Sequence, residues 1–121
     1  MKLVYRFENL KTSLFPFWDI NQEWKITNNY KMISAIENKI NSKFLGYCDR
    51  ESKTICLDLH EDDWKIDLII VHEICHTFRN CSTHGKLWKS RMIKVSDRCD
   101  IMDNFRLADQ IRHELENFEL V

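Results

Sequence analysis

Three histidines and one glutamate near the middle of the chain have the types and spacing needed to hold a metal ion. Residues 72–76 read H-E-x-x-H, and His84 follows further along the chain. On a helix, His72 and His76 lie one turn apart on the same face, so both imidazoles can reach one ion. Glu73 lies about 100° round the helix from His72. From there its carboxylate can contact a metal-bound water but is poorly placed to be a third ligand.

His84 supplies the third ligand in this interpretation. It lies beyond the expected end of the helix, where a returning loop can bring it over the same ion. Three neutral nitrogen ligands with one open coordination position are typical of a catalytic zinc site, whereas structural zinc sites are closed by four protein ligands. The sequence therefore predicts Zn²⁺ held by His72, His76 and His84. Glu73 is then the general base of a zinc-dependent peptidase.

Two alternatives to this zinc site are a chance match to the motif and a different third ligand. H-E-x-x-H also arises by composition alone, and the pair His113-Glu114 shows how partial matches occur, because Asn117 stands where its second histidine would be. The match at residues 72–76 is stronger, since it lies on an apolar helical segment and a third histidine follows. Glu114 could instead serve as a ligand from a later helix, but His84 would then have no role.

Length, composition and charge narrow the class of protein. A chain of 121 residues with 44% hydrophobic residues predicts one packed domain over residues 1–121. The formal net charge is −1, whereas a protein that binds mainly through phosphate contacts usually has a clear basic excess. The five cysteines are odd in number and include no C-x-x-C pair, so we expect reduced thiols and a cytoplasmic location. Neither a signal peptide nor a transmembrane segment is expected.

Hydrophobic periodicity predicts the elements that would position the histidines. Apolar residues at spacings of three and four predict a helix over residues 29–44, and residues 45–48 and 53–59 read as a β-hairpin whose second strand is half-buried. Asp62 or Asp63 should cap a central, largely apolar helix that begins near Trp64 and carries the motif. Later helices should begin at Ser82 or Thr83 and at Asp100. The first 27 residues are ambiguous between strand and helix.

The motif also resembles a known family. H-E-x-x-H at residues 72–76 followed by H-G-x-x-W at residues 84–88 is similar to the signature of the SprT/Spartan-like metallopeptidases, and the similarity extends over residues 45–92. The resemblance implies an α+β, minimal zincin-like domain, in which a small antiparallel sheet or hairpin packs on a central H-E-x-x-H helix with flanking helices. It also implies zinc ligands His72, His76 and His84 with Glu73 as the catalytic base.

The resemblance to this family also implies what the protein would bind. A peptidase takes a protein or peptide substrate, and Spartan-type members cut proteins crosslinked to DNA, so DNA association is a hypothesis for this chain. The basic residues after the motif could form a contact face, although with a net charge of −1 an ordinary solvated helix face is favoured; they are Lys86, Lys89, Arg91, Lys94 and Arg98. Tyr47, Arg50 and His60 are candidates for steadying an oxyanion. The rival function is a non-catalytic zinc-stabilised module that binds protein or nucleic acid.

Overall fold

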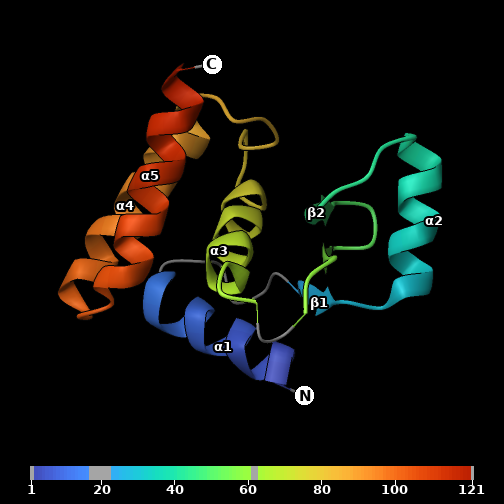
Figure 1. Ribbon diagram of the computed structural model, residues 1–121, viewed down its shortest axis with the longest axis horizontal. Helices are drawn as coiled ribbons and strands as arrows, with labels where there is room; N and C mark the ends of the chain where they lie inside the picture. The colour runs from blue at the N-terminus through green and yellow to red at the C-terminus, as the bar shows by residue number, and fades with distance from the viewer. Residues whose placement is uncertain (1, 17–22, 61–62, 121) are drawn as a thin grey trace.

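The computed structural model describes residues 2–16, 23–60 and 63–120, which form an α+β fold (Figure 1). The helices and strands of this part of the chain are α1 (Lys2–Leu14), β1 (Lys25–Thr27), α2 (Tyr30–Ile40), β2 (Gly46–Asp49), β3 (Thr54–Leu57), α3 (Ile66–His76), α4 (Lys86–Ile101) and α5 (Phe105–Leu120). In Figure 1 the sheet lies between α3 and α2, while α4 and α5 lie on the far side of α3. None of the described helices is long and apolar enough to cross a membrane.

The three described strands form a mixed sheet in the order β1-β3-β2. Strands β2 and β3 pair antiparallel, which confirms the predicted hairpin. Strand β1 pairs parallel to β3, with Ile26 opposite Ile55, so the prediction of a purely antiparallel sheet is wrong. Parallel neighbours need a long crossover connection, and here the chain passes through α2 and β2 between the two strands. A three-residue strand is too short to show a hydrophobic period, which explains why the sequence did not reveal β1.

Strand β3 is buried on both faces, although its sequence predicted a half-buried strand. Ile55 and Leu57 lie opposite Cys48 and Gly46 and face α3, and Cys56 is equally inaccessible on the other face. The strand is central in the sheet and contacts both α2 and α3. Cys56 is small and weakly polar, so it can stand at a buried position in an apparently alternating sequence.

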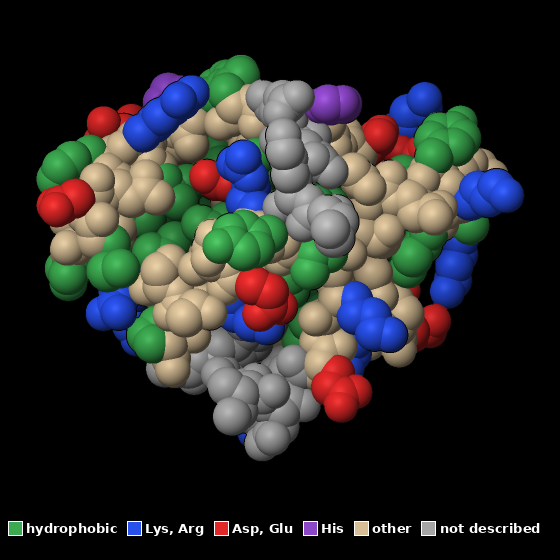
Figure 2. Space-filling view, turned by 90° about the horizontal axis from the view of Figure 1, so that it is seen from below, with side chains coloured by type: hydrophobic (Ala, Val, Ile, Leu, Met, Phe, Trp, Pro, Cys, Tyr) green, Lys and Arg blue, Asp and Glu red, His purple; other side chains and the backbone are tan. Residues whose placement is uncertain are grey.

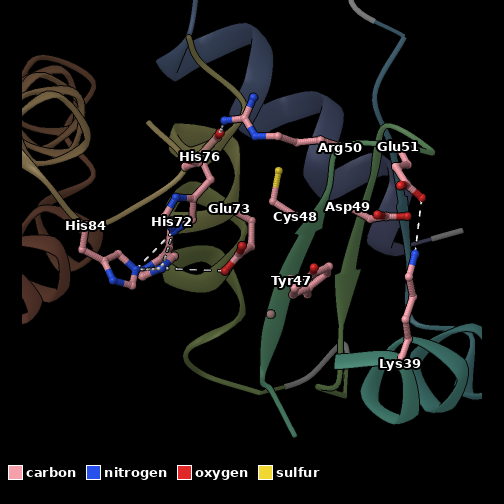
Figure 3. Close-up of a pocket in the computed structure, with 12 residues that line it drawn as sticks. Lys39, Tyr47, Cys48, Asp49, Arg50, Glu51, His72, Glu73, His76 and His84 are labelled. Carbon is pink, nitrogen blue, oxygen red and sulfur yellow. Dashed lines mark hydrogen bonds and ion pairs between the residues drawn. The ribbon is translucent and has the colours of Figure 1, made fainter. Parts of the chain in front are cut away.

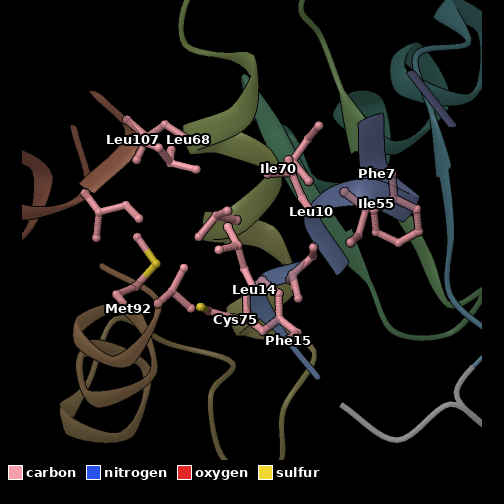
Figure 4. Packing of buried hydrophobic residues seen from close by; sticks show 14 of the residues in the cluster. Phe7, Leu10, Leu14, Phe15, Ile55, Leu68, Ile70, Cys75, Met92 and Leu107 are labelled. Carbon is pink, nitrogen blue, oxygen red and sulfur yellow. The ribbon is translucent and has the colours of Figure 1, made fainter. Parts of the chain in front are cut away.

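Helix α3 is the centre of the core. Its side chains at Ile70, Val71, Ile74 and Cys75 have no exposed surface. In Figure 4, residues of α1 pack on one side of this helix and residues of α4 and α5 on the other. The predicted central helix is therefore confirmed, but Trp64 is 61% exposed and does not belong to its buried stripe.

Two further predictions concern the cap of α3 and the secondary structure of the N-terminal segment. Asp63 Oδ1 accepts a hydrogen bond from the backbone N–H of Lys65, but the N-cap residue of α3 is Lys65, so Asp63 stands in the preceding turn and the helix begins at Ile66. Asp62 lies outside the described residues. Near the N-terminus the structure has a helix rather than a strand: Leu3, Phe7, Leu10 and Leu14 recur at helical spacing and are buried.

The ends of α2, α4 and α5 differ from the predicted positions. Helix α2 ends at Ile40 because Asn41 adopts the left-handed conformation that terminates a helix. Helix α4 begins after Gly85, so neither Ser82 nor Thr83 caps it. Asp100 lies inside α4, and Asn104 instead accepts the backbone N–H of Leu107 at the start of α5. Asp100 instead pairs with Arg112, and local hydrogen-bonding capacity does not by itself fix a helix boundary.

Candidate metal centre

The three predicted ligands converge on one point. The Nε2 atoms of His72 and His76 lie 3.2 Å apart, those of His76 and His84 lie 3.2 Å apart, and those of His84 and His72 lie 3.0 Å apart. His72 and His76 come from the last turns of α3, and His84 comes from the loop before α4 (Figure 3). Among the described residues, these three form a group that could hold a metal ion.

Hydrogen bonds on the far side of two rings determine where their protons lie. His76 Nδ1 is 2.7 Å from the carbonyl oxygen of Cys81, which can only accept, so this nitrogen carries the proton. His72 Nδ1 faces Oε1 of Glu114 in the same way. In the neutral rings both Nε2 atoms therefore present lone pairs to each other. Burial lowers the pKa of His76 to about 4, so its ring is neutral at pH 7 in the absence of a metal ion.

A cation is what makes this arrangement favourable. At most one nitrogen of the three can donate a proton within the cluster, so the remaining contacts would be lone-pair repulsions. A tetrahedral metal with bonds of about 2.0–2.1 Å to nitrogen has nitrogen–nitrogen edges of about 3.3 Å. The observed separations of 3.0–3.2 Å are close to that edge. The donor set thus fits a small divalent cation with an open fourth position.

Trp88 forms the floor beneath the cluster. Its ring centroid lies 4.7 Å from that of His72, 5.5 Å from that of His76 and 4.6 Å from that of His84. Its indole N–H donates to the backbone carbonyl of His72 at 3.3 Å, and the side chain is fully buried. The tryptophan therefore fixes the rings from below and leaves the opposite side of the cluster open.

Glu73 lies beside the cluster and is almost buried. The residue is 5% exposed, and its Oε2 atom is 3.8 Å from Nε2 of His72. Burial raises the pKa of Glu73 to about 7 in the metal-free protein, and the neighbouring His72 acts in the opposite direction. A cation held by the histidines would favour the ionised carboxylate. Glu73 is thus close enough to act on a group bound at the open position, without being one of the converging ligands.

Gly46 makes room for that carboxylate. A Cβ atom on this residue would lie 2.6 Å from Ile69 Cγ2 and 2.8 Å from Glu73 Oε2, both far inside contact distance. A side chain at residue 46 would therefore force its neighbours to move. Gly85 differs, because its φ is −78° and an added Cβ would meet only Thr83 Oγ1, at 3.4 Å.

The cluster opens into a pocket of about 470 Å³. Besides His72, Glu73, His76 and His84, the pocket is lined by Lys39, Gly46, Tyr47, Cys48, Asp49, Arg50, Glu51 and Ser82. Strand β2 forms one wall, as Figure 3 shows, and it is an edge strand of the sheet formed by the described residues. The pocket is therefore open enough for an extended chain to lie between β2 and the histidines.

The structure separates the three candidates for an oxyanion role. Tyr47 lines the pocket, and its ring stacks on Phe44 with centroids 5.2 Å apart. Arg50 also lines the pocket, but its guanidinium donates to the backbone carbonyls of His76 and Phe78 at the end of α3. His60 is exposed and does not line the pocket. Of the three, Tyr47 is the residue whose position suits contact with a bound ligand.

Sequence reasoning missed the groups that hold the histidines from behind. Glu114 contacts Nδ1 of His72, whereas the three converging nitrogens are Nε2 atoms, so the carboxylate orients a ligand and is not one itself. Its other oxygen, Oε2, is buried and has no hydrogen-bond partner among the described residues. No local pattern links residues 72 and 114. The only available signal was a charged residue on the otherwise apolar face of the last helix.

The basic residues that follow the motif are partly used within the protein. Arg98 donates to the carbonyl of Ser13, and the Arg91 guanidinium lies 4.2 Å from the centre of the Phe78 ring. On the face of the molecule shown in Figure 2, Lys and Arg side chains are interspersed with Asp and Glu. These contacts favour the interpretation of an ordinary helix face over a nucleic-acid surface.

Comparison with known proteins adds no relative to this description. The chain matches no protein-family model, no curated protein and no solved structure. Membership of the SprT/Spartan-like family therefore stays a prediction based on residues 72–76, residues 84–88 and the hairpin before them. What the fold and the site define is an α+β protein whose three histidines could hold a metal ion.

Proposed function

We propose that the protein is a zinc-dependent metallopeptidase in which His72, His76 and His84 hold Zn²⁺. The observation that carries the proposal is the convergence of three Nε2 atoms within 3.2 Å of one another at the mouth of an open pocket, beside a buried carboxylate. Neutral imidazole ligands suit zinc, and three of them leave a position for water or substrate. A closed structural site would need neither the free position nor the carboxylate.

Each residue has a distinct part in the proposed reaction. When bound, zinc supplies a Lewis acid that polarises the scissile carbonyl and lowers the pKa of water toward about 7. Glu73 takes the proton from the attacking water and delivers it to the leaving amine. The Cys81 carbonyl and Glu114 keep the protons of the His76 and His72 rings on Nδ1, so that their Nε2 atoms face the metal. Trp88 closes the site from below.

The substrate in this proposal is an extended peptide. Within the described part of the chain no strand pairs with the edge of β2 that runs along the pocket, and a peptide can bind such an edge by adding a strand through backbone hydrogen bonds. This places the peptide between β2 and the histidines, with its backbone held independently of its sequence. Activity on DNA-associated proteins is a narrower form of the same proposal, and it has less support because Arg91 and Arg98 are engaged within the protein.

A non-catalytic zinc-stabilised binding module is the competing function. Such a module would keep the three histidines for stability but would have no use for a buried carboxylate beside the open coordination position. Burying a carboxylate is costly, and the pKa of Glu73 raised by burial is a sign of that cost. We therefore favour the enzyme.

Metal analysis combined with a cleavage assay tests the proposal. The purified protein should contain about one zinc per chain and cleave casein, and a chelator should abolish cleavage.

Glu73→Gln should lower activity by about 10²-fold or more while the zinc content is retained. His84→Ala should lose zinc. Full zinc occupancy with no cleavage of casein or of the protein itself would favour the binding module.

The same cleavage assay with single-stranded DNA added tests whether the substrates are DNA-associated proteins. If DNA contacts matter, adding single-stranded DNA should raise the cleavage rate, and its affinity should fall steeply as salt is added. Cleavage that is unaffected by DNA would leave a general peptidase.

A further inference from the structure

A second cavity lies next to the metal pocket, behind the start of strand β2. It has a volume of about 320 Å³ and a mainly apolar lining. Its lining residues are Leu45, Trp64, Lys65, Leu68, Ile69, Gln110, His113, Glu114 and Asn117. Leu45 and Trp64 expose 52% and 61% of their surface, which is a large apolar area for two neighbouring side chains. The cavity is therefore suited to an apolar group supplied by a ligand.

Three pairs of residues join this cavity to the metal pocket. Leu45 precedes Gly46 in the chain, and each lines one of the two cavities. Ile69 lies one helical turn before Glu73, and both would contact a Cβ atom on Gly46. Gly46, Ile69 and Glu73 thus lie between the two cavities, and Gly46 has no side chain there.

The third pair links the apolar cavity directly to a proposed metal ligand. Glu114 lines the apolar cavity, and its Oε1 atom contacts Nδ1 of His72, which lines the metal pocket. The cavity therefore lies immediately behind the ring of His72.

The sheet edge leads from one cavity to the other. The carbonyl oxygen of Leu45 accepts the backbone N–H of Asp58 at 2.7 Å, so the β2–β3 ladder continues one residue beyond the start of β2. A peptide paired with the outer edge of β2 would therefore pass beside Leu45, whose own carbonyl is engaged on the β3 side. Successive residues of an extended peptide advance about 3.3 Å and point to alternate faces. One side chain close to the proposed cleavage point can thus enter the apolar cavity.

We infer that this cavity selects a large apolar side chain, such as Leu, Ile, Phe or Met, at a fixed position next to the cleaved bond. The inference rests on the proposed function, because the occupant is the peptide held by the metal site. Leu68 and Ile69 form the floor, and Trp64 is held against α5 by a hydrogen bond from Gln110 to its carbonyl. The walls are thus fixed by contacts already made in the protein.

Cleavage-site mapping tests this selectivity. Zinc-loaded protein digests denatured casein, and mass spectrometry reads the residues on both sides of each cut. We expect large apolar residues at one position about tenfold more often than Ala, Ser or Gly. Asn117→Trp places a bulky ring in the cavity away from the metal ligands and should remove this preference. Glu116→Trp, one position earlier on α5 and outside the cavity lining, should retain it.

A binding measurement separates this inference from the proposed reaction. N-acetyl-leucinamide added to the zinc-loaded Glu73→Gln protein should shift the NMR signals of Leu45, Trp64 and Asn117, while N-acetyl-alaninamide should not. Cleavage with no residue preference, or with a preference that Asn117→Trp leaves unchanged, would overturn the inference while the peptidase stands. If nothing is cleaved, the peptidase fails and the probe decides alone: shifts at these residues support the cavity, and their absence refutes it.

Discussion

Two carboxylates contact the histidine cluster, and their positions give them different roles. Glu73 faces the pocket, with Oε2 3.8 Å from Nε2 of His72. Glu114 contacts the opposite nitrogen of the same ring from a helix 42 positions further along the chain. A carboxylate behind a metal-bound histidine fixes the ring orientation and makes the ring a stronger donor. Replacing Glu114 should therefore change mainly the affinity for zinc, and replacing Glu73 should change mainly the rate of cleavage.

Replacement of Glu114 tests that division. Glu114→Ala should weaken zinc binding by about 10–100-fold, because His72 loses the acceptor that fixes its tautomer. Glu114→Gln should lose less, since its amide oxygen can still accept from Nδ1. Competition with a chromogenic chelator measures both, and Glu116→Ala, exposed on the same helix, is the control. Unchanged affinity in Glu114→Ala would mean that Trp88 and the backbone already fix the ring.

A second prediction for a single residue concerns Gly46. Gly46→Ala would press a methyl group against Ile69 and Glu73, so we expect a loss of about 1–3 kcal/mol in the free energy of unfolding and a larger fall in activity than in zinc content. The added variant Ile69→Ala should restore part of the stability by removing one of the two contacts. Urea denaturation and zinc analysis measure these effects.

Gly85→Ser is the matched glycine control, because the position has open space and an ordinary φ of −78°. A serine there can also cap α4, so stability should stay equal or rise by about 0.5 kcal/mol. If both glycine variants lost the same stability, steric pressure at Gly46 would not be the cause.

At the scale of elements, the turn between β2 and β3 holds the C-terminal end of α3. The Arg50 guanidinium donates to the carbonyls of His76, the last residue of α3, and of Phe78, two residues beyond it. Carbonyls at a helix C-terminus lack partners within the helix and carry partial negative charge, so a cation there satisfies both needs. The hairpin thus fixes the segment that leads from His76 towards His84.

Arg50→Met should lower the free energy of unfolding of the zinc-free protein by about 1.5–3 kcal/mol, the usual value for a hydrogen bond to a charged group. Zinc binding should weaken as well, because the loop that carries His84 starts from this end of α3. Urea denaturation with chelator present measures the first effect. Lys53→Met removes an exposed charge from the same turn and should change little. An equal loss in both variants would indicate a general charge effect.

Elements with a regular period were predictable from the sequence, and those fixed by distant contacts were not. The apolar stripes of α3 and the hairpin are local patterns, and the relation of His72 to His76 follows from helix geometry alone. Strand β1 has three residues and depends on β3 for its hydrogen bonds. The contact between Glu114 and His72 exists only once α5 packs against α3. The start of α5 was misplaced because Asp100, which resembles a cap in the sequence, lies inside α4 and pairs with Arg112.

At the scale of the whole molecule, the thiols are part of the core. All five cysteines are free, and Cys56, Cys75, Cys81 and Cys99 are buried. Burial raises the pKa of Cys56 and of Cys99 from 9.0 to about 11. The native state therefore keeps these protons at pH values where the unfolded chain has lost them. The stabilisation is fully present below about pH 8 and is lost as the pH rises towards 11.

This linkage predicts an alkaline loss of stability. Between about pH 9 and 11 the free energy of unfolding should fall by up to about 1.4 kcal/mol per pH unit for each such thiol. Cys99→Ala should show a shallower fall than the unaltered protein, with a constant offset below pH 8 from the lost packing. Urea denaturation under reducing, metal-free conditions at several pH values measures the slopes. Parallel curves for the two proteins would show that Cys99 does not contribute.

The placement of Glu114 on α5 has a consequence for how the centre is assembled during translation. All three histidines are synthesised before the residue that orients His72. A chain that still lacks α5 can therefore meet the ion but should hold it weakly. Firm loading should wait until the last helix docks.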